Sequence, residues 1–182
     1  DPAVSTRALQ AAIDAGAARV VVGGMAGPWI AGPLRLASNQ EIFFEPGAEV
    51  LAKKDAFHGS GDSLFTGSGC VNVRLIGPGA TLRMRRGDYD GPAYTHAEWR
   101  HILNLHSVTN VLVEGLTLAE SGGDGVYLGV DRGGGPCVGV TMRKVLCDRN
   151  YRQGVSVISA ERLLMEDVIL LETGGTAPGA GI

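Results

Sequence analysis

Long apolar runs, aromatic side chains and cysteines are scarce in this sequence, and its charge is nearly balanced. Without an apolar stretch of about 20 residues, it offers no candidate for a membrane-spanning helix. A net charge of −3 gives no electrostatic reason to expect binding to nucleic acid or to anionic membranes. Aromatic residues make up only 5% of the 182 residues while 28 are glycine, which argues against a helical bundle. A chain of this length suits one domain.

Short β-branched segments separated by Gly, Asn and Asp indicate many strands joined by tight turns. In the first third of the chain, the expected strands lie at residues 19–22, 34–36, 41–44, 49–51 and 63–65. One helix signal lies near the N-terminus, where Leu9 and Ile13 are four residues apart on one face. Ser5 or Thr6 can cap this helix and Gly16 can end it, so we expect a helix over residues 6–15.

An internal repeat is visible when the sequence is aligned with itself. The segment NVRLIG at 72–77 aligns with NVLVEG at 110–115, and more distantly with 139–144 and 162–167. The two apolar columns of this alignment are Val73, Val111, Val140, Leu163 and Leu75, Val113, Met142, Met165. One such unit cannot bury its own apolar face, so the copies are expected to stack.

Strands that recur once per repeat, with no hairpin signal between copies, stack in parallel about 4.8 Å apart. This predicts an all-β fold, a right-handed parallel β-helix, in which the N-terminal helix covers the open end of the first coil. We expect a single domain over residues 1–182 that continues beyond Ile182. Cys70 and Cys137 share a column but are one coil too far apart for a disulfide, and Cys147 lies in another column. Three free, buried thiols are therefore expected.

The first coil carries a family resemblance. ALQAAID at 8–14, followed by VVV at 20–22 and GPLRL at 32–36, resembles the start of right-handed parallel β-helix proteins of the pectate lyase-like superfamily. The resemblance covers nearly the whole chain and implies the fold. It does not fix the chemistry, because this fold carries hydrolases, lyases, epimerases, tailspikes and adhesins.

A shorter resemblance concerns Asp124. GDGV at 123–126 resembles part of the Asn-Thr-Asp-Gly segment of polygalacturonase-type glycoside hydrolases, where the Asp belongs to a carboxylate cluster that cleaves the glycosidic bond. Two glycines replace Asn-Thr here, and Gln153 and Gly154 stand where such enzymes carry Asp-Asp. Neither Gly-His-Gly nor Arg-Ile-Lys occurs in the chain. The departures favour a more distant glycan-active relative over a true polygalacturonase.

An insertion lengthens the spacing between the first two repeats. Its residues are RRGDYDGPAYTHAEWRH at 85–101, and the self-alignment places Arg86 level with Asp124. We therefore expect this inserted loop to leave the stack beside Asp124. Long insertions from a regular scaffold commonly carry function. A second, shorter insertion at 130–136 follows the strand that starts after Asp124.

Carboxylates beside exposed aromatic rings suit carbohydrate, because sugars have apolar faces and hydrolysis needs an acid and a base or nucleophile. Glycines around Asp124 suggest that this carboxylate is bare, facing a groove, with Arg86 keeping it ionised as a base or nucleophile. The acid would come from Glu98 or from a coil beyond Ile182. The candidate catalytic residues are Asp124, Glu98, Asp88 and Asp90. The candidate substrate-binding residues are Trp99, Arg100, Tyr94, Tyr127, Arg149 and Arg152, of which the arginines suit a uronate or sulfate.

Structural interpretations stand beside these functional ones. Asp124 also suits a turn, Trp99 can fold back over the stack, and Arg149 and Arg152 suit solvated corners. Three histidines fall on alternating faces of a strand, which argues against a zinc site; they are His96, His101 and His106. Residues 133–135 are glycines without the following Lys of a phosphate-binding loop. No metal or cofactor is therefore expected.

Together these observations predict a glycan-active protein, with hydrolysis of a polysaccharide or oligosaccharide as the leading reaction. A lyase or epimerase, in which Arg or His takes a proton beside a carboxyl-bearing carbon, is one alternative. A non-catalytic carbohydrate-binding or structural β-helix is the other. We expect neither a nucleic-acid nor a membrane partner, and an extracellular or periplasmic location. A second carboxylate within about 5–10 Å of Asp124 would favour hydrolysis over binding alone.

Overall fold

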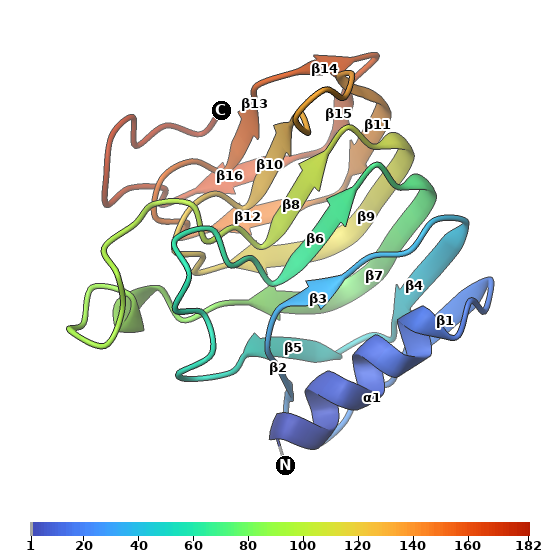
Figure 1. Cartoon of the computed structure of the whole chain (residues 1–182), viewed down its shortest axis with the longest axis horizontal. Helices are drawn as coiled ribbons and strands as arrows, with labels where there is room; N and C mark the ends of the chain where they lie inside the picture. Colours follow the sequence, from blue (N-terminus) through green and yellow to red (C-terminus); the bar gives the residue numbers. More distant parts are fainter. Residues whose placement is uncertain (1) are drawn as a thin grey trace.

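The computed structural model describes residues 2–182 as one helix followed by short strands in two sheets (Figure 1). The helix is α1 (Pro2–Asp14), and a 3-10 turn, η1 (Arg86–Asp88), lies in the long insertion. The eleven-stranded sheet contains β1 (Arg19–Val22), β2 (Trp29–Ala31), β4 (Gln40–Phe44), β5 (Glu49–Ala52), β7 (Val71–Arg83), β9 (Thr109–Ala119), β11 (Cys137–Arg143), β12 (Leu146–Asp148), β14 (Ala160–Glu161), β15 (Leu164–Glu166) and β16 (Ile169–Leu171). The five-stranded sheet contains β3 (Leu34–Arg35), β6 (Phe65–Ser68), β8 (Leu103–His106), β10 (Val126–Gly129) and β13 (Val155–Val157).

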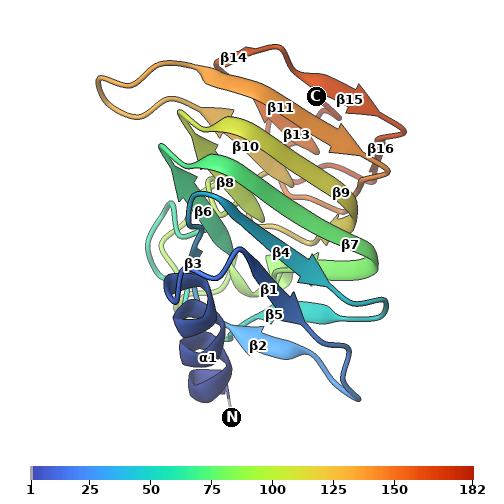
Figure 2. The ribbon, with the colours of Figure 1, turned by 90° about the vertical axis from the view of Figure 1, so that its right-hand side faces the viewer.

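Successive repeats stack as parallel coils, and every strand-to-strand pairing among the described residues is parallel. Figure 2 shows β1, β4, β7, β9 and β11 side by side in this stack. In the first predicted column, Val111 pairs with Val73 on one side and Val140 on the other. In the second, Val113 lies between Leu75 and Met142. The all-β parallel architecture is confirmed, and so are the inward columns as far as Val140 and Met142. Met165 pairs with Met142 in the last coil but is only half-buried, as is Leu163. The right-handed sense stays a prediction.

Each coil turns its corners at residues with positive φ. Asn39, Asn72 and Asn110 lie level with one another and have φ values of 59°, 57° and 55°. Asparagine adopts this left-handed conformation more readily than most residues. The amide of Asn72 donates to Asn39 Oδ1 at 2.8 Å, and the amide of Asn110 donates to Asn72 Oδ1 at 2.7 Å. We call these three residues the asparagine ladder.

Helix α1 begins earlier than the expected residue 6. It starts at Pro2, where a proline fits because the first helical N–H groups have no intrahelical acceptor. Ser5 and Thr6 consequently lie inside the helix, so the prediction that one of them caps it is wrong. Leu9 and Ile13 are buried as predicted, and Gly16, with φ of 71°, follows the helix.

The helix also satisfies the free edge of the first coil. Gln10 lies against β3, where its Oε1 accepts from Arg35 N at 2.9 Å and its Nε2 donates to Arg35 O at 3.1 Å. A neighbouring strand would bond the same two groups of Arg35. Thr6 Oγ1 accepts from Gly32 N at 2.9 Å in the same manner. The helix thus protects an edge that would otherwise pair with another chain.

The inserted loop at 85–101 packs against the loop between β5 and β6. Tyr89 is buried against Phe57, and the Tyr94 ring stacks on His58 at 5.1 Å between centroids. These contacts hold the end of the insertion, including Trp99, beside the start of β8. Elsewhere the three cysteines are buried and free, as predicted. No helix among residues 2–182 is long and apolar enough to cross a membrane.

Candidate functional site

A column of buried polar side chains lies at the corner where each coil enters the five-stranded sheet. Ser63 Oγ accepts from His101 N at 3.2 Å, and His101 Nδ1 accepts from Asp124 N at 2.9 Å. Asp124 Oδ1 in turn accepts from Gln153 N at 3.0 Å. Each side chain therefore accepts a hydrogen bond from the backbone of the following coil. We call Ser63, His101 and Asp124 the corner column.

Asp124 is fully buried, with 0% of its surface exposed, so the prediction of a bare carboxylate is wrong. Its glycine neighbours do not open it to solvent, because the adjacent coils cover it. Burial raises its pKa from 3.8 to about 6, although Ser156, Arg152 and Gln153 act in the opposite direction. Arg152 Nη1 lies 3.3 Å from Asp124 Oδ2 and is the cation beside it. This pKa suits an acid, whereas a base or nucleophile was expected.

His101 is neutral in this setting. Burial lowers its pKa from 6.5 to about 3, and the charges of Arg152 and His106 act in the same direction. Since Nδ1 accepts the Asp124 N–H, the ring proton of the neutral form is assigned to Nε2. Nδ1 also lies 3.4 Å from Asp124 Oδ2, but a neutral ring makes this contact no ion pair.

Arg152 joins Asp124 to a second carboxylate. Its Nε lies 3.9 Å from Glu98 Oε2, while its Nη1 contacts both Asp124 Oδ2 and Ser156 Oγ at 3.3 Å. A guanidinium is a rigid fork, so one group that contacts both carboxylates places them within roughly 10 Å of each other. Glu98 has 33% of its side chain exposed and also accepts from Thr176 Oγ1 at 3.2 Å. A second carboxylate is therefore present near Asp124, no farther away than the widest separation that glycosidic hydrolysis uses, about 10 Å.

An open platform of rings adjoins this corner on the outward face of the five-stranded sheet. Trp99 is 49% exposed and borders a shallow recess of about 180 Å³. The other residues around this recess are Gly61, His101, Asn104, His106 and Tyr127. The Tyr127 ring stacks on His101 with centroids 4.8 Å apart and is tilted against His106 at 5.4 Å. We call Trp99, Asn104, His106 and Tyr127 the aromatic platform.

The second insertion closes the far side of the platform. Asp131 Oδ2 accepts from Ser68 Oγ at 2.6 Å, and Asp131 Oδ1 lies 3.9 Å from His106 Nδ1. Ser107 anchors the same loop, because its Oγ accepts from Asp131 N and donates to Gly135 O. The platform thus lies between a carboxylate at each end, Glu98 at the corner and Asp131 at the loop.

Two predicted substrate-binding residues are instead part of the packing of the insertion. Arg100 is fully buried; it donates to Phe57 O at 2.8 Å and Thr95 O at 2.8 Å. Its guanidinium lies over the rings of Tyr89 and Tyr94. Tyr94 accepts from Asp55 N through its hydroxyl. Both side chains hold the loop together, so neither is free to receive a sugar.

Three other predicted residues, and Arg86, lie away from the corner column. Asp88 and Asp90 border separate recesses that both include Glu120. Arg149 borders the recess of Asp90 and pairs with Glu120 at 3.0 Å. Arg86 donates to the backbone of Arg149 and of residue 174, so it is not the cation beside Asp124. The structure therefore brings Glu98, Trp99, Tyr127 and Arg152 to Asp124, but not these residues.

Several site residues were missed from the sequence. Those that line the platform or the corner are Ser63, His101, Asn104, His106, Gln153 and Ser156. The parallel register of the structure, which the self-alignment did not give, places Thr66, Asn104, Tyr127 and Ser156 in one row. Aligning the outward positions of the predicted strands, and not only the inward columns, would have found this row. Among residues 2–182, no group of three or more His, Cys, Asp or Glu side chains is arranged to hold a metal ion.

Comparison with known proteins gives a fold neighbour and a longer sequence relative. No family model matches the sequence. The SPbeta prophage-derived uncharacterized protein YorA of Bacillus subtilis is 28% identical over 162 residues, which cover 84% of this chain but only 27% of YorA. A crystal structure described as a "putative glycosyl hydrolase" from Parabacteroides merdae has a TM-score of 0.63 and 18% identity, covering 91% of this chain and 90% of the other. At this identity the likeness supports the fold.

Proposed function

We propose that the protein binds a polysaccharide on the aromatic platform and hydrolyses it as a glycoside hydrolase. The observation that carries this proposal is the placement of exposed Trp99 and half-buried Tyr127 beside a corner where one guanidinium joins two carboxylates. Sugar rings present apolar faces that pack on such aromatic side chains. Glycosidic hydrolysis requires two carboxyl groups on either side of the bond. The fold neighbour described as a "putative glycosyl hydrolase" agrees with the same class of reaction.

The two carboxyl groups suit different roles. Asp124 keeps its proton up to about pH 6 because it is buried, so it suits the acid that protonates the leaving oxygen. Glu98 is partly exposed and lies beside Arg152, so it suits the base or nucleophile. Arg152 covers Asp124 and is itself only 20% exposed. Access of a sugar to Asp124 therefore requires the Arg152 side chain to move away from it.

The test uses soluble polygalacturonate, xylan and mixed-linkage glucan with the wild-type protein and two variants. Binding is measured by retardation in polysaccharide gels, and hydrolysis by the release of reducing ends. Trp99→Ala should weaken binding, whereas Glu98→Gln should bind normally and release reducing ends at least a hundredfold more slowly. Asp90→Asn, an exposed carboxylate away from the corner, is the matched control and should behave as wild type. Equal hydrolysis by Glu98→Gln and wild type would contradict the assignment.

Binding without hydrolysis is the second candidate function, and one observation favours it. Both Asp124 oxygens already have protein partners, Gln153 N and Arg152, and neither is exposed. In that case wild type is retarded by a polysaccharide, Trp99→Ala is not, and no reducing ends appear. Product with unsaturated ends would instead indicate a lyase. The same gels and product analysis therefore distinguish the three activities.

A further inference from the structure

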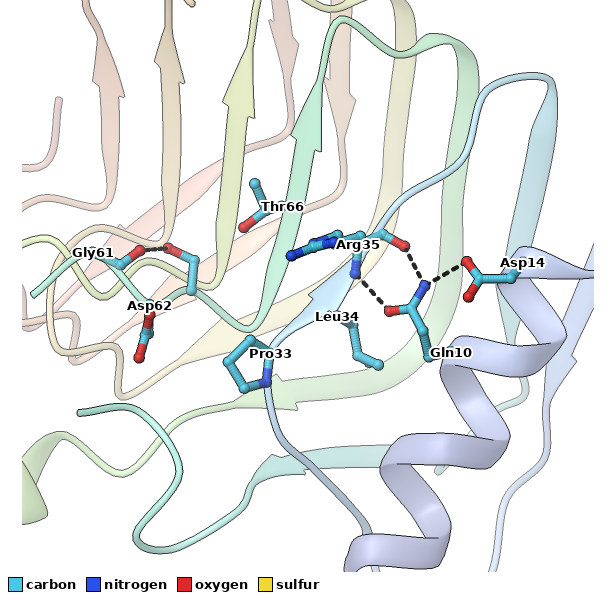
Figure 3. Close-up of a pocket in the computed structure, with 9 residues that line it drawn as sticks. Gln10, Asp14, Pro33, Leu34, Arg35, Gly61, Asp62 and Thr66 are labelled. Atoms are coloured by element: carbon cyan, nitrogen blue, oxygen red, sulfur yellow. Dashed lines mark hydrogen bonds between the residues drawn. The ribbon is translucent and has the colours of Figure 1, made fainter. Parts of the chain in front are cut away.

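A recess lies beside α1, at the end of the five-stranded sheet. It has a volume of about 470 Å³, and Figure 3 draws the residues that line it. Its lining comes from the helix, from β3, from the loop before β6 and from β6 itself. The polar side chains among these residues are Gln10, Asp14, Arg35, Asp62, Ser63 and Thr66. We call it the helix-side recess.

The helix-side recess presents unused donors and acceptors. Arg35 is exposed, its guanidinium makes no hydrogen bond or ion pair with any described residue, and Figure 3 shows it extending toward Thr66. Asp14 accepts one hydrogen bond from Gln10, and Asp62 accepts one from Gly59 N at 2.7 Å. Each carboxylate keeps a second oxygen for an outside donor. Vicinal sugar hydroxyls, which both donate and accept, match such a set.

The helix-side recess lies next to the recess that the aromatic platform borders. Gly61 borders both. The outward residues Arg35, Thr66, Asn104 and Tyr127 form one row across β3, β6, β8 and β10, each in register with the next. Three strand spacings separate Arg35 from Tyr127, which is roughly 14 Å. One glycan of several units can therefore contact both places at once.

We propose that the helix-side recess is a second sugar subsite, which holds a distal unit of the glycan bound on the aromatic platform. This inference rests on the proposed function. Gln10 fixes the backbone of Arg35 from the helix, so α1 both covers the edge of the first coil and forms one wall of the subsite. The helix also lies across the end of the row (Figure 1), so the glycan ends or turns outward there. Long oligosaccharides should consequently bind more tightly than short ones.

The experiment measures calorimetric affinity for xylo-oligosaccharides and oligogalacturonides, each from the disaccharide to the octasaccharide. For wild type, affinity rises with length until one oligomer spans both places. Arg35→Ala should weaken binding of the longest oligomers about tenfold, since it removes charge-assisted hydrogen bonds, and leave the shortest unchanged. Trp99→Ala should weaken binding at every length. Arg143→Ala removes an exposed arginine from β11 and serves as the matched control.

The outcomes separate this inference from the proposed function. If Arg35→Ala binds every length as wild type does while Trp99→Ala loses binding, the second subsite is wrong and the platform stands. If Arg35→Ala weakens short and long oligomers equally, the recess is not distal and the inference is also wrong. If wild type binds neither series, or if Trp99→Ala changes nothing, the proposed function fails and the subsite fails with it.

Discussion

Two columns of polar residues follow the coils of this protein, one exposed and one buried. The asparagine ladder lies on the outside and consists of one residue type, each amide bonded to the next side chain. The corner column lies inside and consists of Ser, His and Asp, each bonded to the backbone N–H of the following coil. Both columns connect successive coils with hydrogen bonds, but they differ in what those bonds require of the side chain.

The asparagine ladder needs asparagine, because only an amide both donates and accepts along the column while tolerating positive φ. The corner column needs only an acceptor at each position. Ser63 supplies one without any ionisable group. His101 and Asp124 therefore carry more chemistry than their hydrogen bonds explain, and burying ionisable groups costs free energy. A buried and chemically varied column beside an exposed platform is the better candidate for function, and an exposed uniform one for stability.

Asp124→Ala should have the largest effect of the substitutions that compare the two columns. It leaves Gln153 N without an acceptor and Arg152 without its buried partner. Removing one member of a buried charged pair costs about 3–5 kcal/mol of the free energy of unfolding. Urea unfolding at neutral pH measures this loss. Asp90→Ala, at an exposed position, is the control, and a loss below about 1 kcal/mol at Asp124 would show that the corner column contributes little.

Stability as a function of pH gives the next largest effect. Asp124 has a raised pKa, so its contribution to the free energy of unfolding is full below pH 3.8 and is lost as the pH rises to about 6. His101 has a lowered pKa, so its contribution is full above pH 6.5 and is lost as the pH falls to about 3. The two slopes are opposite and each about 1.4 kcal/mol per pH unit, so they cancel between about pH 4 and 6. In Asp124→Asn only the pH dependence due to His101 remains. The free energy of unfolding of this variant should therefore fall by about 2–3 kcal/mol more than that of wild type between pH 6 and pH 4.

Urea unfolding of wild type and Asp124→Asn at several pH values between 4 and 6.5 checks this cancellation. Asp131→Asn removes a carboxylate at the other end of the platform and controls for general charge effects. Parallel pH profiles for wild type and Asp124→Asn would mean that Asp124 does not titrate in this range. Its assignment as the acid would then also be wrong.

The fold was predictable because the repeat makes its inward columns regular. Apolar residues recur in each coil at the positions of Val111 and Val113, and both valines stack on their counterparts in the neighbouring coils as the alignment predicts. The insertion was also predicted to reach the corner of Asp124, and it does bring Glu98 and Trp99 there. Regular spacing therefore sufficed for the scaffold and for the approximate position of the site.

The burial of Asp124 was not predictable in the same way. Its glycine neighbours suggest exposure, but the residues that cover it come from other coils. His101 lies where the insertion returns to the stack, and Arg152 lies at a bend, so the aligned strands fix neither side chain. The roles of Arg100 and Tyr94 depend on packing within the insertion, which has no repeat to align. Side chains that meet across irregular segments are those that an alignment of repeats cannot place.

The smallest expected effect belongs to the asparagine ladder. Asn72 is its middle member, and Asn72→Gly removes both side-chain hydrogen bonds while keeping access to positive φ. Because the ladder is exposed, we expect a loss of about 1–2 kcal/mol, with each bond at the low end of the usual range. Gly139, with φ of 68°, follows Asn110 in the same column, so the backbone there accepts glycine.

Asn72→Ala should cost about 1 kcal/mol more than Asn72→Gly, since alanine resists the left-handed conformation. Both losses should be independent of pH between 4 and 6.5, because no ionisable group is removed. A loss for Asn72→Gly as large as that for Asp124→Ala would show that the exposed column stabilises the coils as much as the buried one, and the functional reading of the corner column would lose its main support.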